Sequence, residues 1–348
     1  MAKCYIRQIF NGVKKFLLFL FSLLIGAGLF FWIGKVVGWQ EIKKAFLVFT
    51  GWQGIVILAL TSLMALIGTW KWKEILKGQG LKISFKNLLN PYLAGFSIMF
   101  LAPILVWAGE IFRAYVLKEK NSVSWTKGMA SVIIDRILEW TTNLVVIFFG
   151  ALFFLYKIGL PSRNIAIIFG GVFLVFVIGI SFFYFKTFKR ESMAKALIKI
   201  FNNRLDSQPL EIEKEIFDFF RPKKISMWKA VGISFLRATI MYFRTWFLII
   251  FLGKNIGAFA ALSILGFTYL AAMIPIPTAL GSHEAIQTFA FNSLKLGLPT
   301  ATAFTMIIRG AELLMALFGV IILFHFGVRT IKKMFFKKID NFTNKYEI

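Results

Sequence analysis

The sequence predicts an all-α polytopic membrane protein with about six spanning helices and two re-entrant helical hairpins, arranged as an inverted-topology repeat. Three observations lead to this prediction. Apolar residues make up 58% of the chain, and the mean hydropathy is +0.75. Several uncharged stretches reach the roughly 20 residues that a helix needs to cross a bilayer. Lys and Arg gather in separate clusters along the chain, and one pattern of charged residues occurs twice.

The clusters of basic residues predict which connections face the cytoplasm, because cytoplasmic loops of membrane proteins are rich in Lys and Arg. The rich segments are 1–15, 71–86, 111–127, 186–229 and 327–348. The poor connections, which we expect on the outer side, are 35–44, 157–163, 253–257 and 285–301. Both termini are therefore expected in the cytoplasm of a cell-membrane protein. The same rule accounts for the net charge of +25 without nucleic-acid binding.

These side assignments fix the course of the first half of the chain. Segment 16–34 is read as a retained first helix, too long for a signal peptide, and 45–70 returns. The apolar segment 87–109 lies between two cytoplasmic clusters, so it must return to the side that it left. We expect a re-entrant hairpin there, broken between Ala94-Gly95 and Pro103. Segment 128–156 then spans the membrane.

The second half repeats this order from the opposite side. Segments 164–185 and 228–252 span, 258–298 forms a hairpin broken at Pro275-Ile276-Pro277, and 302–326 spans. Many transporters use such an inverted repeat. The predicted organisation is one transmembrane domain, 1–326, with repeat one at about 16–156, repeat two at about 164–326, a cytoplasmic insert at 187–227 and a basic tail at 327–348.

The insert carries a helix pattern with one apolar face. Met193, Leu197, Ile200, Phe201 and Leu205 share that face, which predicts a helix lying on the bilayer surface. Residues 210–220 fit the same description, and a solvated linker is the alternative. Five tryptophans are predicted to lie in the membrane interfaces: Trp32, Trp39, Trp52, Trp70 and Trp72.

The repeated charge pattern predicts a site in the middle of the membrane. Pro103 and Pro277 each precede a glutamate by seven residues, Glu110 and Glu284. An Arg-x-x-Glu pair follows each, Arg136 with Glu139 and Arg309 with Glu312. Charged side chains within apolar segments are costly and usually mark a site. Two hairpins that meet at mid-membrane would line a cavity with Glu110 and Glu284, whereas chance spacing is the alternative.

Four blocks of sequence resemble those of a known family. AGEIFRAYVLK (108–118), SVIIDRILEW (131–140), IPIPTALGSHEA (274–285) and IIRGAELLMALFG (307–319) resemble the signature blocks of the lysylphosphatidylglycerol synthase transmembrane-region family, whose members are flippase-like membrane proteins. The resemblance covers roughly residues 16–326. Thr278-Ala279 stand where the family usually has paired glycines, which bears on the flexibility of the second hairpin.

The resemblance implies movement of lipids across the membrane. Full-length synthases carry a soluble aminoacyl-transferase domain after this region, and this sequence reaches Ile348 without one. We therefore expect a lipid flippase or exporter with alternating access rather than an enzyme. The substrate class expected is a phosphate-bearing lipid, either a phospholipid or a polyprenyl-phosphate-linked glycan carrier. An intramembrane polyprenyl-diphosphate phosphatase and a scaffold for a partner enzyme are the alternatives.

The acidic candidates have two readings. Glu110 or Glu284 either binds a cationic headgroup or takes up a proton, because burial favours the neutral form of a carboxyl group. His283 either relays that proton or only forms a hydrogen bond. Arg136 with Glu139, and Arg309 with Glu312, are either structural ion pairs or sites where Arg binds phosphate.

Three further arginines complete the predicted substrate-binding set. Arg237 and Arg244 lie seven residues apart on one face of a helix that contains no carboxylate. Arg237 falls near mid-bilayer and needs a carboxylate or a lipid phosphate, whereas Arg244 is expected to snorkel outward. Arg113 is a candidate headgroup contact at the cytoplasmic entrance. The single cysteine, Cys4, excludes an intrachain disulfide, and the two histidines lie far apart, so no metal or cofactor is expected.

Overall fold

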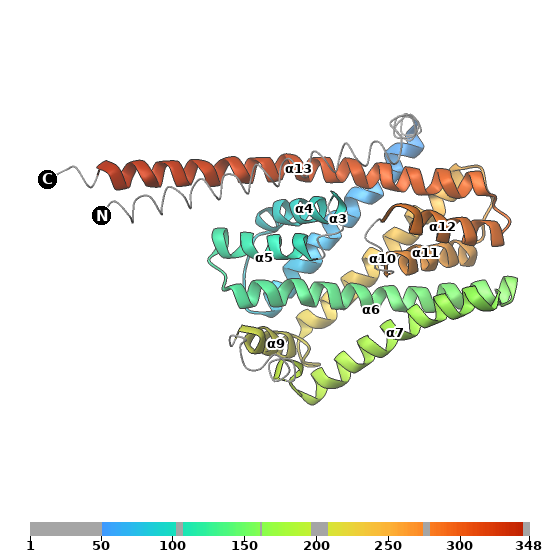
Figure 1. Cartoon of the computed structure of the whole chain (residues 1–348), viewed down its shortest axis with the longest axis horizontal. Coiled ribbons are helices and arrows are strands. Elements are labelled where there is room, and N and C mark those ends of the chain that lie inside the picture. Colours follow the sequence, from blue (N-terminus) through green and yellow to red (C-terminus); the bar gives the residue numbers. More distant parts are fainter. Residues whose placement is uncertain (1–50, 102–106, 161, 196–207, 274–278, 344–348) are drawn as a thin grey trace.

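The computed structural model describes residues 51–101, 107–160, 162–195, 208–273 and 279–343, with the side chains at 165, 279–285 and 327–343 left out. Every regular element in these ranges is a helix (Figure 1). The helices are α3 Trp52–Gly78, α4 Phe85–Leu101, α5 Ala108–Asn121, α6 Trp125–Ile158, α7 Arg163–Lys189, α9 Gln208–Phe219, α10 Ile225–Phe251, α11 Ala258–Met273, α12 Ala279–Ser293 and α13 Leu298–Thr343.

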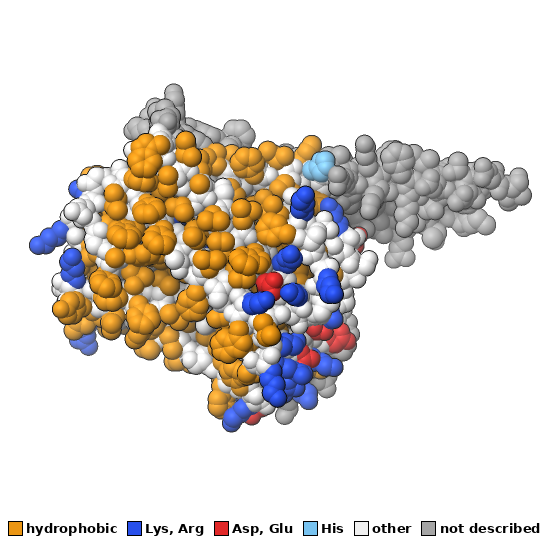
Figure 2. Space-filling model, turned by 180° about the vertical axis from the view of Figure 1, so that it is seen from behind, with side chains coloured by type: hydrophobic (Ala, Val, Ile, Leu, Met, Phe, Trp, Pro, Cys, Tyr) orange, Lys and Arg blue, Asp and Glu red, His pale blue; other side chains and the backbone are white. Residues whose placement is uncertain are grey.

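Five of the described helices are long and apolar enough to cross a membrane, namely α3, α6, α7, α10 and α13. The all-α polytopic fold is thereby confirmed. Helix α7 shows what faces the lipid, since Ile167, Leu174, Val175 and Ile178 are all exposed. Apolar side chains cover much of the face in Figure 2, and basic side chains gather at one end of it. The predicted helix 16–34 lies outside the described residues.

The helices fall into two sets of four that follow the same spacing. We call α3, α4, α5 and α6 the first set, and α10, α11, α12 and α13 the second set. Three pairs of helices begin 173 residues apart: Trp52 with Ile225, Phe85 with Ala258, and Trp125 with Leu298. Helices α3 and α10 both have 27 residues. Residues of α3, α4 and α6 thus have counterparts in α10, α11 and α13, whereas α5 and α12 begin 171 residues apart.

Contacts between the two sets follow the same correspondence. Helices α3 and α10 pack against each other across the middle of the molecule (Figure 1). Helix α4 packs on α13, and its counterpart α11 packs on α6. In both crossings a serine of the shorter helix donates to a carbonyl of the longer one, Ser97 to Ala316 at 2.6 Å and Ser263 to Gly150 at 2.9 Å. Each set therefore packs its short second helix against the long fourth helix of the other set.

One end of the molecule collects the basic connections. Lys224, just before α10, donates to the carbonyl of Gly78 at the end of α3, 2.9 Å away. Lys127, at the start of α6, donates to the carbonyl of Gln79 at 3.3 Å. The pair α4–α5 starts and ends at this basic end. The pair α11–α12 starts and ends at the other, where Tyr242 of α10 donates to the carbonyl of Ala258.

One predicted boundary in the first set was wrong. Helix α4 ends at Leu101, inside the range 94–103 in which a break was expected. Residues 111–127, expected as a basic connection, contain most of α5, which packs against α4. The stretch was misread because Lys118 and Lys120 lie only in the last turn of that helix. The predicted breaks at Pro103 and at Pro275-Ile276-Pro277 lie outside the described residues.

The predicted insert and tail also differ in detail. Residues 210–220 do form a helix, α9, but its buried Ile216 and Phe219 contact α6 and its neighbours instead of a bilayer surface. Glu213 ties this helix to the chain ahead of it, accepting from the amide of Ala194 at 3.0 Å. Residues 196–207 lie outside the described part. The tail continues α13 as helix to Thr343.

Candidate functional site

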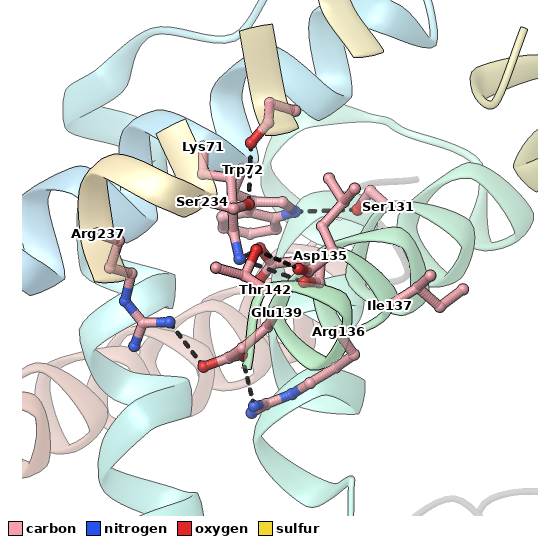
Figure 3. Close-up of polar contacts among 12 residues, drawn as sticks. Lys71, Trp72, Ser131, Asp135, Arg136, Ile137, Glu139, Thr142, Ser234 and Arg237 are labelled. Carbon is pink, nitrogen blue, oxygen red and sulfur yellow. Dashed lines mark hydrogen bonds and ion pairs between the residues drawn. The ribbon is translucent and has the colours of Figure 1, made fainter. Parts of the chain in front are cut away.

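A layer of charged side chains crosses the first set of helices and reaches α10. It contains four cations, Lys71, Arg113, Arg136 and Arg237, and three carboxylates, Glu110, Asp135 and Glu139. These seven residues come from α3, α5, α6 and α10. Figure 3 shows the part of the layer around α6. Among the described side chains, the layer therefore has one more cation than carboxylates.

Asp135 lies at the centre of the fully buried part of this layer. Its carboxylate forms ion pairs with Lys71 at 2.7 Å and with Arg113 at 2.9 Å, and all three side chains are at most 5% exposed. The guanidinium of Arg113 also lies over the rings of Trp72 and Tyr92, 4.1 and 4.8 Å from their centroids. Such stacking stabilises a cation away from water. This part is closed on all sides by protein.

Trp72 was predicted at the membrane interface, and that prediction was wrong. Its side chain is fully buried, and its indole N–H donates to the hydroxyl of Ser131 at 3.0 Å. Trp52 and Trp70 are exposed, as an interfacial position requires. Trp72 and the neighbouring Lys71 of α3 both contact α6, through Ser131 and Asp135. Trp32 and Trp39 lie outside the described residues.

Glu139 belongs to the more exposed part of the layer, and its ion pairs join the two helix sets. Its carboxylate accepts from Arg136 of the same helix at 2.9 Å and from Arg237 of α10 at 2.6 Å (Figure 3). Arg136 also pairs with Glu110 in the first turn of α5. Glu139 and Arg237 keep 21% and 23% of their side-chain surface exposed. Counted along the helices, both lie roughly 20 Å from the basic end.

A small polar pocket adjoins Glu139. Its lining consists of Lys71, Glu139, Thr142, Asn143, Ser234, Arg237, Ala238 and Tyr269. The space suffices for about one water molecule. Two cations, one carboxylate and several hydrogen-bonding groups therefore converge on a site that holds little more than a water molecule. A larger group needs the lining side chains or helices to move.

Arg244 forms a separate pair in the second set. Its guanidinium is fully buried, donating to Glu312 at 3.1 Å and to the hydroxyl of Thr61 at 3.2 Å. The expectation that Arg244 snorkels outward was wrong, because α13 supplies a carboxylate inside the bundle. Glu312 thus pairs with Arg244 of α10, a contact that the sequence pattern did not indicate.

The structure brings together only part of the predicted set. Glu110, Arg136, Glu139 and Arg237 form one chain of ion pairs, and Arg113 joins the same layer through Asp135. Arg309 lies half-buried on α13. His283 and Glu284 belong to α12, and their side chains lie outside the described part. The predicted meeting of Glu110 with Glu284 therefore stays a prediction.

Sequence reasoning missed Lys71 as a member of the site. It was counted with the cytoplasmic cluster 71–86, yet its side chain is 1% exposed. The signal that would have found it is the spacing of 173 residues, which places Lys71 opposite Arg244 on the corresponding helix. Tyr269 and Ser234 were also missed, since single hydroxyl residues in apolar helices carry no pattern of their own.

Comparison with known proteins places this architecture in a family. A UPF0104 membrane protein of Pyrococcus horikoshii is 24% identical over 316 residues, covering 85% of this chain and 92% of that protein. A UPF0104 membrane protein of Methanocaldococcus jannaschii is 22% identical over 286 residues, covering 78% and 84%. No solved structure matches the chain. The family model of the lysylphosphatidylglycerol synthase transmembrane region matches residues 19–319, and the chain belongs to this family of membrane proteins.

Proposed function

We propose that the protein is a lipid flippase or exporter, which moves a phosphate-bearing lipid across the membrane by alternating access. The observation that carries the proposal is the contact between Arg237 and Glu139, within a layer whose described side chains include more cations than carboxylates. A cation surplus at membrane depth is costly unless an anion compensates it. A phosphate headgroup supplies that anion, and guanidinium groups bind phosphate through paired hydrogen bonds.

The proposal includes an inverted repeat in the membrane. The 173-residue spacing, the matching contacts and the opposite ends at which α4–α5 and α11–α12 begin support it. In this arrangement the two pairs are re-entrant hairpins, and the basic end with both termini faces the cytoplasm. Exchanging the conformations of the two sets would move the polar pocket from one side of the bilayer to the other.

Lipid translocation by the purified full chain tests the function. The protein is reconstituted into liposomes that contain fluorescent phosphatidylglycerol or a polyprenyl-phosphate lipid, and loss of outer-leaflet signal is followed. We expect wild-type protein to exceed protein-free liposomes. Arg237→Gln should slow movement about tenfold or more, because a hydrogen bond to a charged group contributes about 1.5–3 kcal/mol. Arg221→Gln, on the exposed surface, is the matched control.

Two outcomes would reject this function. Translocation equal to that of empty liposomes for all phosphate-bearing lipids rejects transport. Release of inorganic phosphate from a polyprenyl diphosphate would favour an intramembrane phosphatase. Proton coupling is a separate part of the proposal, tested with Glu284→Gln, which should abolish any dependence on a pH gradient. A dependence that survives in Glu284→Gln removes that part alone.

A further inference from the structure

The pocket beside α6 is lined by groups suited to an oxyanion. Lys71 and Arg237 supply positive charge and Asn143 supplies an amide, whereas the hydroxyls of Thr142 and Ser234 donate to carbonyls of their own helices and would have to turn toward a ligand. Guanidinium and ammonium groups with hydroxyl neighbours are the usual protein ligands of phosphate oxygens. Glu139 is the acidic member of the same lining. Its carboxylate therefore lies where a bound anion would be most stable.

Glu139 differs from the other carboxylates of the layer because it forms the ion pair with Arg237. Lys71 and Arg113 are held by Asp135, and Arg136 is held by Glu110 as well as by Glu139. For Arg237 the observed ion pair is with Glu139. The Nε–H of Arg237 is buried without an acceptor in the described part of the chain. Removing the Glu139 carboxylate would thus leave one guanidinium beside the pocket uncompensated and leave the rest of the layer paired.

The exposure of the pairs separates an exchangeable contact from fixed ones. Lys71, Asp135 and Arg113 are at most 5% exposed, and Arg244 is not exposed at all. Glu139 and Arg237 each keep about a fifth of their surface accessible. Arg244 stays fully buried although its partner Glu312 is 27% exposed, whereas a ligand can reach Arg237 without dismantling the core. Two nitrogen donors from different helices meet one carboxylate there, as they would meet two oxygens of one phosphate.

We infer that Glu139 is an internal occupant of an oxyanion site, and that a phosphate group takes its place on Arg237 and Arg136. This inference rests on the proposed function and deepens it. The bound species is a tetrahedral phosphate ester or free phosphate. When it binds, the carboxylate of Glu139 moves away from Arg237, and the contact that joins α6 to α10 passes through the ligand. No covalent bond changes.

A binding experiment with Glu139→Gln tests this inference. The purified full chain in detergent is titrated with short-chain phosphatidylglycerol, the corresponding diacylglycerol without phosphate, or inorganic phosphate, and the melting temperature is recorded. We expect Glu139→Gln to bind a phosphate-bearing probe at least tenfold more tightly than wild type, because wild type must first displace its own carboxylate. Tightening by phosphatidylglycerol alone identifies a lipid headgroup, and tightening by both probes identifies phosphate in general.

Glu312→Gln is the matched control. Glu312 lies 173 residues after Glu139 and also pairs with an arginine of α10. Its partner Arg244 is fully buried, so no probe should bind more tightly to this variant. Equal responses of the two variants, or no tightening in Glu139→Gln, would overturn the inference. Should Glu139→Gln not fold, Glu139→Asp retracts the charge by one methylene, and an affinity for both phosphate probes no higher than in wild type overturns the inference equally.

The outcome is separable from that of the transport assay. Lipid translocation with no tightening in Glu139→Gln would keep the transport function and remove the oxyanion site. Tightening without translocation would keep the site and remove the transport function. The binding readout needs no membrane movement, so the two results are independent.

Discussion

The two sets of helices share one backbone plan but differ in charge. Residues at corresponding positions agree for Arg136 with Arg309 and for Glu139 with Glu312. They disagree at Asp135, whose counterpart is the buried apolar Ile308. Arg113 follows Glu110 by three residues, and in the second set Gln287 follows Glu284 by three. The first set therefore buries a carboxylate and an arginine where the second set buries the neutral Ile308 and Gln287, whereas the buried cation Lys71 has a buried cation, Arg244, as its counterpart.

This difference shows that the two sets share their helix packing but not their buried charges. The same helix pairs pack in both sets, and in each crossing a serine of the shorter helix donates to a carbonyl of the longer one, although the two serines do not stand at corresponding positions. The two sets carry different charges. All residues of the layer except Arg237 belong to the first set, and Arg237 is the contact with the second set. The counterpart of Arg237 on α3 is Met64, which carries no charge.

The largest expected effect comes from removing the extra carboxylate of the first set. Asp135→Asn leaves Lys71 and Arg113 buried without their negative counter-charge. Loss of one partner of a buried pair costs about 3–5 kcal/mol. The measurement is the free energy of unfolding in mixed micelles. Adding Arg113→Gln, which imitates the second set, should recover part of the loss, and a loss below about 1 kcal/mol for Asp135→Asn would contradict the comparison.

The second largest effect is expected from the corresponding pair of the second set. Glu312→Gln removes the charged acceptor of Arg244 but leaves the hydrogen bond to Thr61. Since a hydrogen bond to a charged group contributes about 1.5–3 kcal/mol, the loss should fall in that range. The same unfolding assay measures it. If Glu312→Gln destabilised the protein more than Asp135→Asn, the buried charges of the first set would not contribute more to stability than those of the second set.

A smaller effect is expected at the close approach of α4 to α5. A Cβ added at Gly95 would lie 2.8 Å from the carbonyl oxygen of Gly109 and 2.9 Å from the stem of Arg113. Gly95→Ala should therefore cost about 1–3 kcal/mol, as overpacking usually does. At the corresponding position of the second set, Thr268 accepts from Gln287 at 2.6 Å. Thr268→Ala should cost about 1 kcal/mol, and the reverse order would contradict the stated packing.

The smallest effects test the symmetry itself. Ser97→Ala and Ser263→Ala each remove one hydrogen bond between the sets. Hydrogen bonds between membrane helices contribute about 0.6 kcal/mol on average. We expect the two losses in unfolding free energy to agree with each other to within about 0.5 kcal/mol. A large loss for one serine and none for the other would show that the two crossings are not equivalent.

The sequence predicted the fold class and much of the helix order for a physical reason. Long apolar runs and basic clusters are strong local signals, so the spans that became α6, α7, α10 and the start of α13 were found within a few residues. The end of α5 was missed because its polar last turn resembles a loop. Local composition does not distinguish the amphipathic arm of a helix pair from a surface connection.

The candidate site was predicted in part, because charges in apolar segments are visible but their partners are not. Arg136 and Glu139 were paired correctly, being one turn apart. The contacts of Arg237 with Glu139 and of Arg244 with Glu312 join residues 98 and 68 positions apart. Only packing decides which distant helices meet. Lys71 was hidden because it adjoins a true basic cluster, although its burial depends on α6.

The central claim is that α6 and α10 separate at the polar pocket whenever a lipid crosses. Cysteines at Thr142 and Ala238, which line the pocket from these two helices, test it in a Cys4→Ser background. Bridging them with a short reducible cross-linker should stop translocation in liposomes, and reduction should restore it, while single-cysteine variants stay active. Translocation at the full rate with the bridge in place would contradict the claim.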